Sequence, residues 1–294
     1  MTVNLSALNA ASPAAFVATL GAVFEHAPWV AEGAASGRPY ATVADLFAAM
    51  RATVEGADEA RRLALLHGHP ELAGRAARAG RVAPSSIAEQ AAAGLDRLSD
   101  AEIARFEALN AAYRDKFGLP FILCVKRHGR ASLLATFERR LGATVDVERR
   151  VAEAEVLRIA AIRLDALVSG DGSTRTTGRI STHVLDTCLG RPAAGVALEL
   201  FEIVSATEAV CVAHAITNDD GRTDVPLIHG RPVPMAAYEL RVGLGDYHRR
   251  LGLDLPDPPF LDVVPLRFGV SEPEGHYHVP LAATPWSYQT YRGS

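Results

Sequence analysis

Cysteine is scarce in this sequence. There are three, Cys124, Cys188 and Cys211, and none of them belongs to a Cys-x-x-Cys motif. An odd and sparse set argues against a disulfide framework and against a zinc site built on cysteine. We therefore expect small, buried thiol side chains in a protein of a reducing compartment.

Long apolar runs and an excess of charge of one sign are also missing. The sequence contains no stretch of about 18 uncharged apolar residues, the length that a transmembrane helix needs. Its N-terminus lacks the basic segment and unbroken apolar core of a signal peptide. The net charge of -4 provides no overall positive field that would attract nucleic acid. We expect a cytoplasmic protein with neither nucleic acid nor a membrane as a partner.

The remaining composition is that of a globular protein, because 49% of the residues are hydrophobic and 22% are charged. A chain of 294 residues corresponds to about two average domains, each long enough to bury its own core.

The first half has the periodicity of α-helices. Apolar residues in the range 9–167 recur at intervals of three and four, as in the stripe Leu46, Phe47, Met50 and Val54. Ser12 before Pro13 is typical of a helix N-cap with proline at the first helical position. Ser99 and Glu102 form a capping-box pattern ahead of a helical stretch that Gly118 ends. These patterns predict an all-α domain over residues 1–167.

The second half has the periodicity of β-strands. Residues 169–178 contain no large apolar side chain, and such a composition predicts a flexible linker, which we place at 168–178. Beyond it, apolar residues alternate with others at period two, as in Val196, Leu198 and Leu200 and in Tyr238, Leu240 and Val242. Turn-forming residues separate these runs. Short strands at this spacing predict a β-sandwich over residues 179–294.

Histidines of the second half occupy predicted strands. Alternation places His183 on one strand face, and it places His276 and His278 together on one face of another strand. Arg222 follows the turn-forming run Asn218–Gly221. Imidazoles with an arginine suit hydrolysis of a small anion, because histidine activates water and a guanidinium binds negative charge. From the residues alone, incidental strand or core histidines remain the alternative, and a metal site lacks a third ligand at zinc-site spacing.

Four segments of this half resemble signature segments of the 5-hydroxyisourate hydrolase family, the enzymatic relatives of transthyretin. They are Ile180–Asp186, Thr217–Arg222, His276–Leu281 and Tyr288–Ser294, in family order, and the terminal Tyr-Arg-Gly-Ser is highly specific. The resemblance implies a transthyretin-like β-sandwich that assembles into a dimer or tetramer. It further implies catalytic roles for His183, Arg222 and His278 and substrate contacts for His276, Tyr291, Arg292 and Ser294. Trp286–Tyr288 departs from the Tyr-Gly-Tyr often found in this family.

A break between helical stretches in the first half carries a further histidine. His69 precedes Pro70, which biases it towards an extended backbone from which the imidazole can project into a pocket. A helix-terminal histidine that interacts with the helix dipole is the alternative. Ser86 and Glu89 have capping-box spacing at a predicted helix start, and Glu89 could do no more than cap that helix.

With the segment Asn110–Ile122, these motifs resemble the 2-oxo-4-hydroxy-4-carboxy-5-ureidoimidazoline (OHCU) decarboxylase family, an all-helical and cofactor-free family. The resemblance covers about residues 8–167. It implies that His69 is the catalytic acid or base, assisted by Glu89. It also implies a substrate pocket formed by Pro70, Ser86, Gln90 and the segment Phe121, Ile122, Leu123, Cys124 and Val125.

Together the resemblances predict a bifunctional enzyme of urate breakdown that hydrolyses 5-hydroxyisourate and decarboxylates the product to (S)-allantoin. No cofactor and no metal are expected, and the partners are the two substrates and further copies of the chain. Tethering would raise the local concentration of the second substrate. The competing hypotheses are a transthyretin-like binding protein and an enzyme in which only one domain is active.

Overall fold

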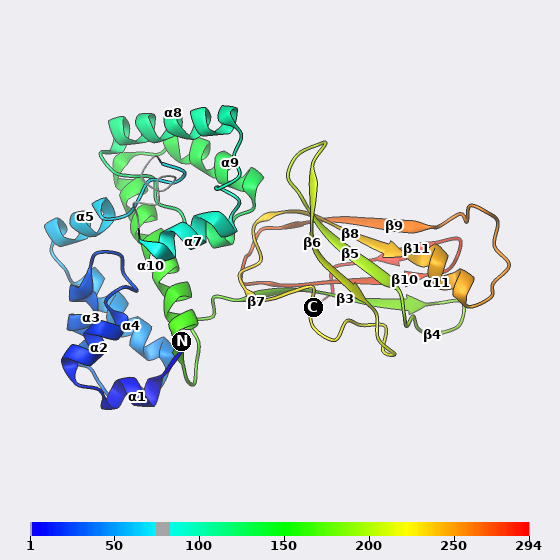
Figure 1. Cartoon of the computed structure of the whole chain (residues 1–294), viewed down its shortest axis with the longest axis horizontal. Coiled ribbons are helices and arrows are strands. Elements are labelled where there is room, and N and C mark those ends of the chain that lie inside the picture. The colour runs from blue at the N-terminus through cyan, green and yellow to red at the C-terminus, as the bar shows by residue number, and fades with distance from the viewer. Residues whose placement is uncertain (1, 75–82, 294) are drawn as a thin grey trace. The chain divides into compact units, whose positions relative to one another are not determined.

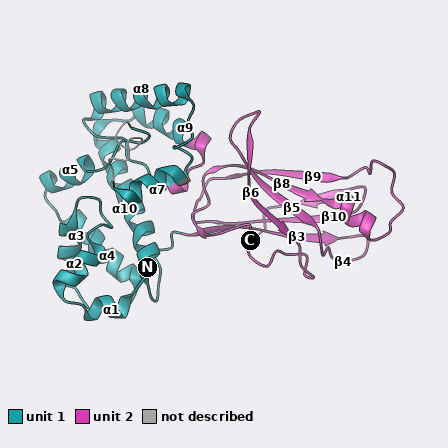
Figure 2. Cartoon of the chain, in the orientation of Figure 1, with its two compact units in different colours: residues 1–125, 133–176 teal, residues 126–132, 177–294 magenta. Residues whose placement is uncertain are grey.

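The computed structural model describes residues 2–74 and 83–293 (Figure 1). The chain divides into two compact units, one of residues 1–125 and 133–176 and the other of residues 126–132 and 177–294 (Figure 2). Within the described ranges, no helix is long and apolar enough to cross a membrane.

The first unit is built from helices, as the periodicity predicts. Its described helices are α1 (Leu5–Ala10), α2 (Pro13–Leu20), α3 (Pro28–Ala35), α4 (Val43–Glu55), α5 (Glu59–His67), α7 (Pro84–Ala92), α8 (Asp100–Phe117), α9 (Arg130–Leu141) and α10 (Val145–Leu167), with the 3-10 turn η1 (Val125–Arg127) before α9. The first residues of α9 and the last two of η1 are grouped with the second unit. One parallel pair of two-residue strands, β1 (Val3–Asn4) and β2 (Val168–Ser169), is the exception to an all-helical unit.

One hydrophobic core holds these helices together. Phe16 on α2 and Leu46 and Met50 on α4 are fully buried in it. Phe106 and Phe137, far from them in the sequence, are buried in the same core. Full burial of each such side chain contributes about 1.5–3 kcal/mol. The helices therefore depend on tertiary packing of their apolar faces more than on their own propensities.

Two of the predicted helix caps are confirmed and a third is wrong. Ser12 Oγ accepts from Ala15 N–H, and both hydrogen bonds of the Ser99 capping box are present. Helix α7, in contrast, begins at Pro84, so Ser86 lies inside its first turn. The Ser86 hydroxyl donates to the buried carboxylate of Glu25 at 2.6 Å instead of capping the helix. Pro84 already provides the preorganised first position of this helix.

The predicted flexible linker differs from the structure, because residues 168–176 are bound to the first unit. We call residues 168–176 the strap. Backbone carbonyls of Asp171 and Gly172 accept from Val43 and Ala44 N–H at 2.9 and 2.8 Å, where helix α4 has free donors. Asp165 on α10 accepts hydrogen bonds from three donors of the strap, the backbone and hydroxyl of Thr174 and the hydroxyl of Thr176. The composition of this segment correctly indicates that no large apolar side chain holds it in place. Hydrogen bonds hold it instead, and the composition does not reveal them.

The second unit consists of two sheets, as the period-two pattern predicts. Its strands are β3 (Gly178–Asp186), β4 (Arg191–Pro192), β5 (Ala197–Ile203), β6 (Ala209–Ile216), β7 (Ile228–Arg231), β8 (Ala236–Gly243), β9 (Val263–Val270), β10 (His276–Ala283) and β11 (Tyr288–Thr290), and helix α11 (Leu244–Arg250) follows β8. One sheet has the order β11-β10-β3-β4, with β7 also paired to β3, and the other has the order β6-β5-β8-β9.

The two sheets share one core, to which β3, β5, β8, β9 and β10 all contribute (Figure 1). Strands β3 and β10 are parallel neighbours, and their register pairs Ser181 with His278 and Arg179 with His276. Since side chains alternate between faces, the inner positions of β3 are apolar or buried, and Ser181 and His183 lie on its outer face. This register brings the predicted histidines of two distant segments together.

Candidate active sites in the two units

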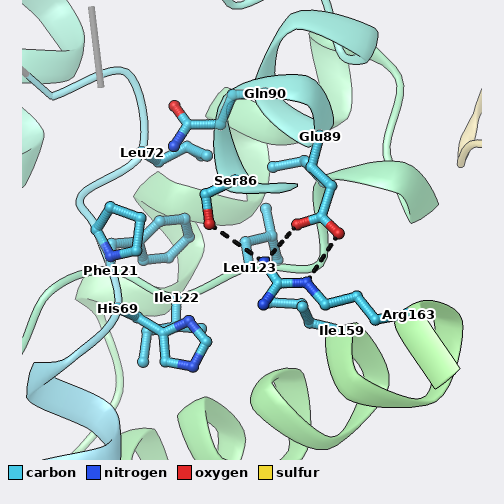
Figure 3. Close-up of a pocket in the computed structure, with 12 residues that line it drawn as sticks. His69, Leu72, Ser86, Glu89, Gln90, Phe121, Ile122, Leu123, Ile159 and Arg163 are labelled. Carbon is cyan, nitrogen blue, oxygen red and sulfur yellow. Dashed lines mark hydrogen bonds and ion pairs between the residues drawn. The ribbon is translucent and has the colours of Figure 1, made fainter. Parts of the chain in front are cut away.

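A pocket in the first unit contains most of the residues predicted for decarboxylation (Figure 3). The predicted residues that line it are His69, Pro70, Ser86, Glu89, Gln90, Phe121, Ile122, Leu123 and Val125. Leu72, Ile159 and Arg163 also line it and were not predicted. Cys124 is not among the lining residues.

His69 reaches this pocket from the break after helix α5. Its side chain is almost completely buried, at 7% exposure for the whole residue, and no described residue makes a hydrogen bond with Nε2. Burial, with a smaller effect of the nearby Arg163 guanidinium, lowers the pKa of His69 from 6.5 to about 3. The imidazole is therefore neutral near pH 7 and can accept a proton.

Arg163 is the pocket's cation, and sequence reasoning missed it. Its guanidinium makes two parallel hydrogen bonds with the Glu89 carboxylate, Nε to Oε1 at 3.0 Å and Nη2 to Oε2 at 2.8 Å (Figure 3). Nη2 also lies 3.2 Å from Ser86 Oγ, while Nη1 is buried and has no hydrogen-bond partner among the described residues. The sequence does contain a pattern that could have indicated it, because Arg163 is the single charged residue in the otherwise apolar run Ile159–Leu164 of α10.

Glu89 is thus engaged by Arg163 and does not cap helix α7. Both carboxylate oxygens of Glu89 accept from Arg163. Gln90 is partly engaged too, because its Oε1 accepts from the Ala73 backbone N–H at 2.9 Å.

The segment 121–125 is held in place by two buried side chains. Arg140 donates to the Ile122 carbonyl at 2.8 Å, and the Cys124 N–H donates to Glu155 at 2.8 Å. Arg140 itself is paired with Glu148, to which Tyr113 also donates. The Cys124 amide is consequently not available to substrate, and this segment lines the pocket with Phe121, Ile122, Leu123 and Val125 instead.

In the second unit, the outer faces of β3 and β10 gather the predicted histidines. Ser181 Oγ lies 2.8 Å from His276 Nε2 and 3.0 Å from His278 Nδ1, so one hydroxyl joins the two imidazoles. Arg179 Nη2 lies 3.2 Å from His276 Nδ1. His183 follows on the same face of β3, and its Nε2 is buried without a hydrogen-bond partner among the described residues.

The turn before Arg222 is tight, as predicted, and it is bound to β3. Asn218 Oδ1 accepts from the N–H groups of Asp220 and Arg222, both at 3.1 Å. Gly221 has a φ of 69° and its carbonyl accepts from Val184 N–H at 2.8 Å. A Cβ at this position would clash with the Val184 carbonyl, so glycine is required. Docking of the turn beside Val184 brings Arg222 near His183.

Burial and positive neighbours keep these histidines neutral. Burial lowers the pKa of His183, and the Arg222 guanidinium lowers it further, although a backbone hydrogen bond and the charge of Asp220 act in the opposite direction. Burial and then Arg222, His276 and His183 lower the pKa of His278. Burial and then Arg179 lower the pKa of His276. Neutral imidazoles of this kind are suited to accept a proton from water.

The end of the chain lies beside His278. Gly293 N–H donates to the His278 carbonyl at 2.9 Å, and a side chain at Gly293 would clash with the His278 ring. Tyr291, Arg292 and His278 line a cavity of about 410 Å³ next to β9, whereas His183 and Arg222 do not line it. Arg292 stacks on the Tyr277 ring, with 5.0 Å between the guanidinium carbon and the ring centroid. Ser294, also predicted to bind substrate, lies outside the described residues.

Comparison with known proteins identifies both halves. The OHCU decarboxylase family model matches residues 9–165, and the HIUase/transthyretin family model matches residues 180–293. The chain therefore belongs to the OHCU decarboxylase family through its helical region and to the HIUase/transthyretin family through its β-rich region.

Individual relatives agree with this assignment. The chain is similar to a 5-hydroxyisourate hydrolase of Ralstonia nicotianae, with 51% identity over 117 residues that cover 40% of this chain and 99% of the relative. It is also similar to a 2-oxo-4-hydroxy-4-carboxy-5-ureidoimidazoline decarboxylase of Haloferax volcanii, with 40% identity over 161 residues that cover 55% of this chain and 94% of the relative. A crystal structure of (S)-allantoin synthase matches 99% of this chain and 100% of its own, with 34% identity and a TM-score of 0.53.

Proposed function

We infer that this chain is a bifunctional enzyme of urate catabolism. Its β-rich unit hydrolyses 5-hydroxyisourate, and its helical unit decarboxylates the resulting OHCU to (S)-allantoin. The observation that carries this conclusion is the similarity to (S)-allantoin synthase, because it extends over nearly the whole of both chains. The relatives of each half separately carry the names of the two activities.

For decarboxylation, we assign the substrate's carboxylate to Arg163 and its hydroxyl to His69. The Nη1 group of Arg163 is a buried donor with no hydrogen-bond partner among the described residues, and an anion would pair with it through a charge-assisted hydrogen bond. Neutral His69 accepts the hydroxyl proton through Nε2. The bond between the ring and the carboxylate then breaks, CO2 leaves, and the electron pair moves into the ring, where a ring nitrogen takes a proton from water.

The same imidazole, now protonated, returns the proton to a ring carbon. The pocket presents His69 to one face of the substrate, because segment 121–125 and residues of α7 enclose the other sides. Delivery to one face yields one enantiomer, which accounts for (S)-allantoin rather than the racemate. Pro70, Ser86, Glu89 and Gln90 shape this pocket.

For hydrolysis, we assign His183 as the base that activates water, with His278 as the second catalytic histidine. Arg222 binds the anionic substrate and lies near both imidazoles, whose pKa values its charge lowers. His276 is joined to His278 through Ser181 and has a supporting role. Tyr291, Arg292 and Ser294 contribute to substrate binding from the chain end.

Two variants test this division of labour. We expect His69→Ala to lower the rate of decarboxylation by about 10²–10⁴-fold and to leave hydrolysis unchanged, and His183→Ala to do the reverse. Hydroxyisourate made from urate by urate oxidase is followed by its ultraviolet absorbance, and (S)-allantoin by circular dichroism. The exposed histidines His67 and His214 provide matched controls as His67→Ala and His214→Ala.

These measurements also separate the competing hypotheses. A transthyretin-like binding protein would leave the decay of hydroxyisourate at its spontaneous rate. An enzyme with one active domain would accelerate one signal only. Loss of both activities from a single substitution would indicate shared folding of the units and would contradict independent sites.

We also propose that the chain assembles into a dimer or tetramer through its β-rich unit. Strand β11 lies at the edge of its sheet, and its three residues are exposed. An exposed strand edge is a template for pairing with another copy. Light scattering should give a mass of two or four times 31.3 kDa.

A further inference from the structure

A buried carboxylate contacts the decarboxylase pocket from outside its lining. Glu25 lies between α2 and α3, is 4% exposed, and is not among the residues that line the pocket. Its Oε2 accepts from Ser86 Oγ at 2.6 Å and from Arg163 Nη2 at 3.2 Å, and it lies 3.9 Å from His69 Nδ1. One oxygen therefore connects three residues of the proposed site.

We propose that Glu25 is a positioning residue for the decarboxylation, an inference that rests on the proposed function of this unit. It sets the tautomer of His69 and the direction of the Arg163 guanidinium, and it does not touch the substrate.

The nitrogen of His69 that faces Glu25 is Nδ1. A distance of 3.9 Å is too long for a hydrogen bond, but a carboxylate so close to Nδ1 favours the tautomer with its proton on that nitrogen. The lone pair is then on Nε2, the nitrogen that has no hydrogen-bond partner among the described residues. This is the tautomer that a proton-accepting His69 needs.

Glu25 and Glu89 together fix the direction of the Arg163 guanidinium. Glu89 occupies Nε and Nη2, and Glu25 with Ser86 occupies the other side of Nη2. Nη1 is left as a buried donor without a hydrogen-bond partner in the part of the chain that the structure describes. Two carboxylates thus hold the guanidinium so that its remaining N–H groups are available to a carboxylate of the substrate.

The backbone at this position supports a specific role. His26, the next residue, has a φ of 55°, a left-handed conformation that residues other than glycine rarely adopt. Neighbouring Phe24 and Ala27 are buried apolar residues, so this turn inserts a carboxylate into an otherwise apolar stretch. Burial of a carboxylate costs free energy, and Glu25 Oε1 has no hydrogen-bond partner in the described chain.

The test is Glu25→Gln in the full chain, a change that keeps the shape of the side chain and removes its charge. We expect kcat for decarboxylation to fall about 10- to 100-fold, as misplacement of a catalytic group does, while KM changes less than about threefold. Hydrolysis of 5-hydroxyisourate by the same preparation should be unchanged. Glu32→Gln, at an exposed position on α3, is the matched control and should retain the wild-type kcat.

A kcat within about twofold of wild type in folded Glu25→Gln would overturn the proposal, and so would a rise in KM with kcat unchanged. If this variant does not fold, Glu25→Asp replaces it, because withdrawing the charged group also breaks its three contacts. Full kcat in folded Glu25→Asp would equally overturn the proposal. A wild-type chain that forms no optically active allantoin would contradict the proposed function instead, so the two failures are distinguishable.

Discussion

The Arg163 side chain makes several contacts at once in the pocket of the helical unit. It neutralises Glu89 through two parallel hydrogen bonds, contacts Glu25 and Ser86, and retains one donor group for an anion. Only a planar guanidinium has enough donors in the right directions for these contacts. Lysine provides the same charge at a single point.

We therefore expect Arg163→Lys to lower kcat/KM for decarboxylation by about 100-fold, since a lysine cannot hold Glu89 and bind substrate in this geometry. Steady-state kinetics followed by circular dichroism of allantoin would measure the effect. Arg150→Lys, at an exposed position of the same helix, should have no effect. A fully active Arg163→Lys would mean that charge alone is needed here.

Among secondary-structure elements, the strap of residues 168–176 changes most between sequence and structure. Its glycines, serines and threonines are typical of a flexible linker, yet Asp165 accepts three hydrogen bonds from Thr174 and Thr176. Carbonyls of the strap also satisfy free N–H groups at the start of α4. Residues 168–176 consequently belong to the helical unit.

The strap leads to a prediction for proteolysis. Arg175 is an exposed trypsin site within it, and we expect it to be protected because cleavage needs local opening. Asp165→Ala should accelerate cleavage after Arg175 about tenfold, since losing these hydrogen bonds lowers the free energy of opening by about 1–2 kcal/mol. Limited trypsin digestion with mass spectrometry measures this rate. The control is Asp171→Ala, which removes an exposed carboxylate of the same segment and should leave the cleavage rate unchanged. Rapid cleavage of the wild type at Arg175 would show that the strap is flexible and would contradict the prediction.

At the scale of the whole molecule, buried and partly buried histidines in both units couple stability to pH. Burial is the largest cause that lowers the pKa of His69, to about 3, and that lowers the pKa of His183, His248, His276 and His278. In the unfolded chain these groups have the ordinary pKa near 6.5. Below that pH the unfolded state binds more protons than the folded state, so the free energy of unfolding falls as pH falls from about 6.5 towards the folded pKa.

We accordingly expect the Tm to fall between pH 7.5 and pH 5.5. A histidine that stays neutral in the folded state over this interval contributes a loss of about 1 kcal/mol, or about 2–4 °C in the Tm of a domain of this size. His69→Gln should reduce the fall for the helical unit by that amount, as measured by calorimetry at the two pH values. His67→Gln, at an exposed histidine two residues away, should show the wild-type fall. An identical fall in His69→Gln would contradict the role of His69.

Sequence reasoning was most successful where structure depends on neighbours in the chain. The helical and strand periodicities predicted both units, and the caps at Ser12 and Ser99 are confirmed because their partners lie three residues away. Ser86 has the same spacing to Glu89, but its hydroxyl donates to Glu25, 61 positions away. A capping pattern reflects only neighbouring residues, whereas the Ser86 hydroxyl forms its hydrogen bond with a buried carboxylate from a distant part of the chain.

The candidate sites were predicted largely through family resemblance. Residue chemistry alone left open whether His69 is a helix-terminal histidine and whether the strand histidines are incidental. The structure brings Arg163 to Glu89 across 74 positions and shows that Cys124 lies outside the pocket lining. Neither fact has a local pattern, because the packing of helices α7 and α10 decides it.

The sequence by itself determined the two kinds of secondary structure, their order along the chain and the segments that carry the two family signatures. These follow from periodicity and from short-range preferences of the backbone. Only the tertiary structure decided which charges meet. The placement of Arg163 between Glu89 and Glu25 and of Ser181 between two imidazoles depends on packing between segments distant in the sequence. Burial then gives these contacts their strength and sets the pKa of His69.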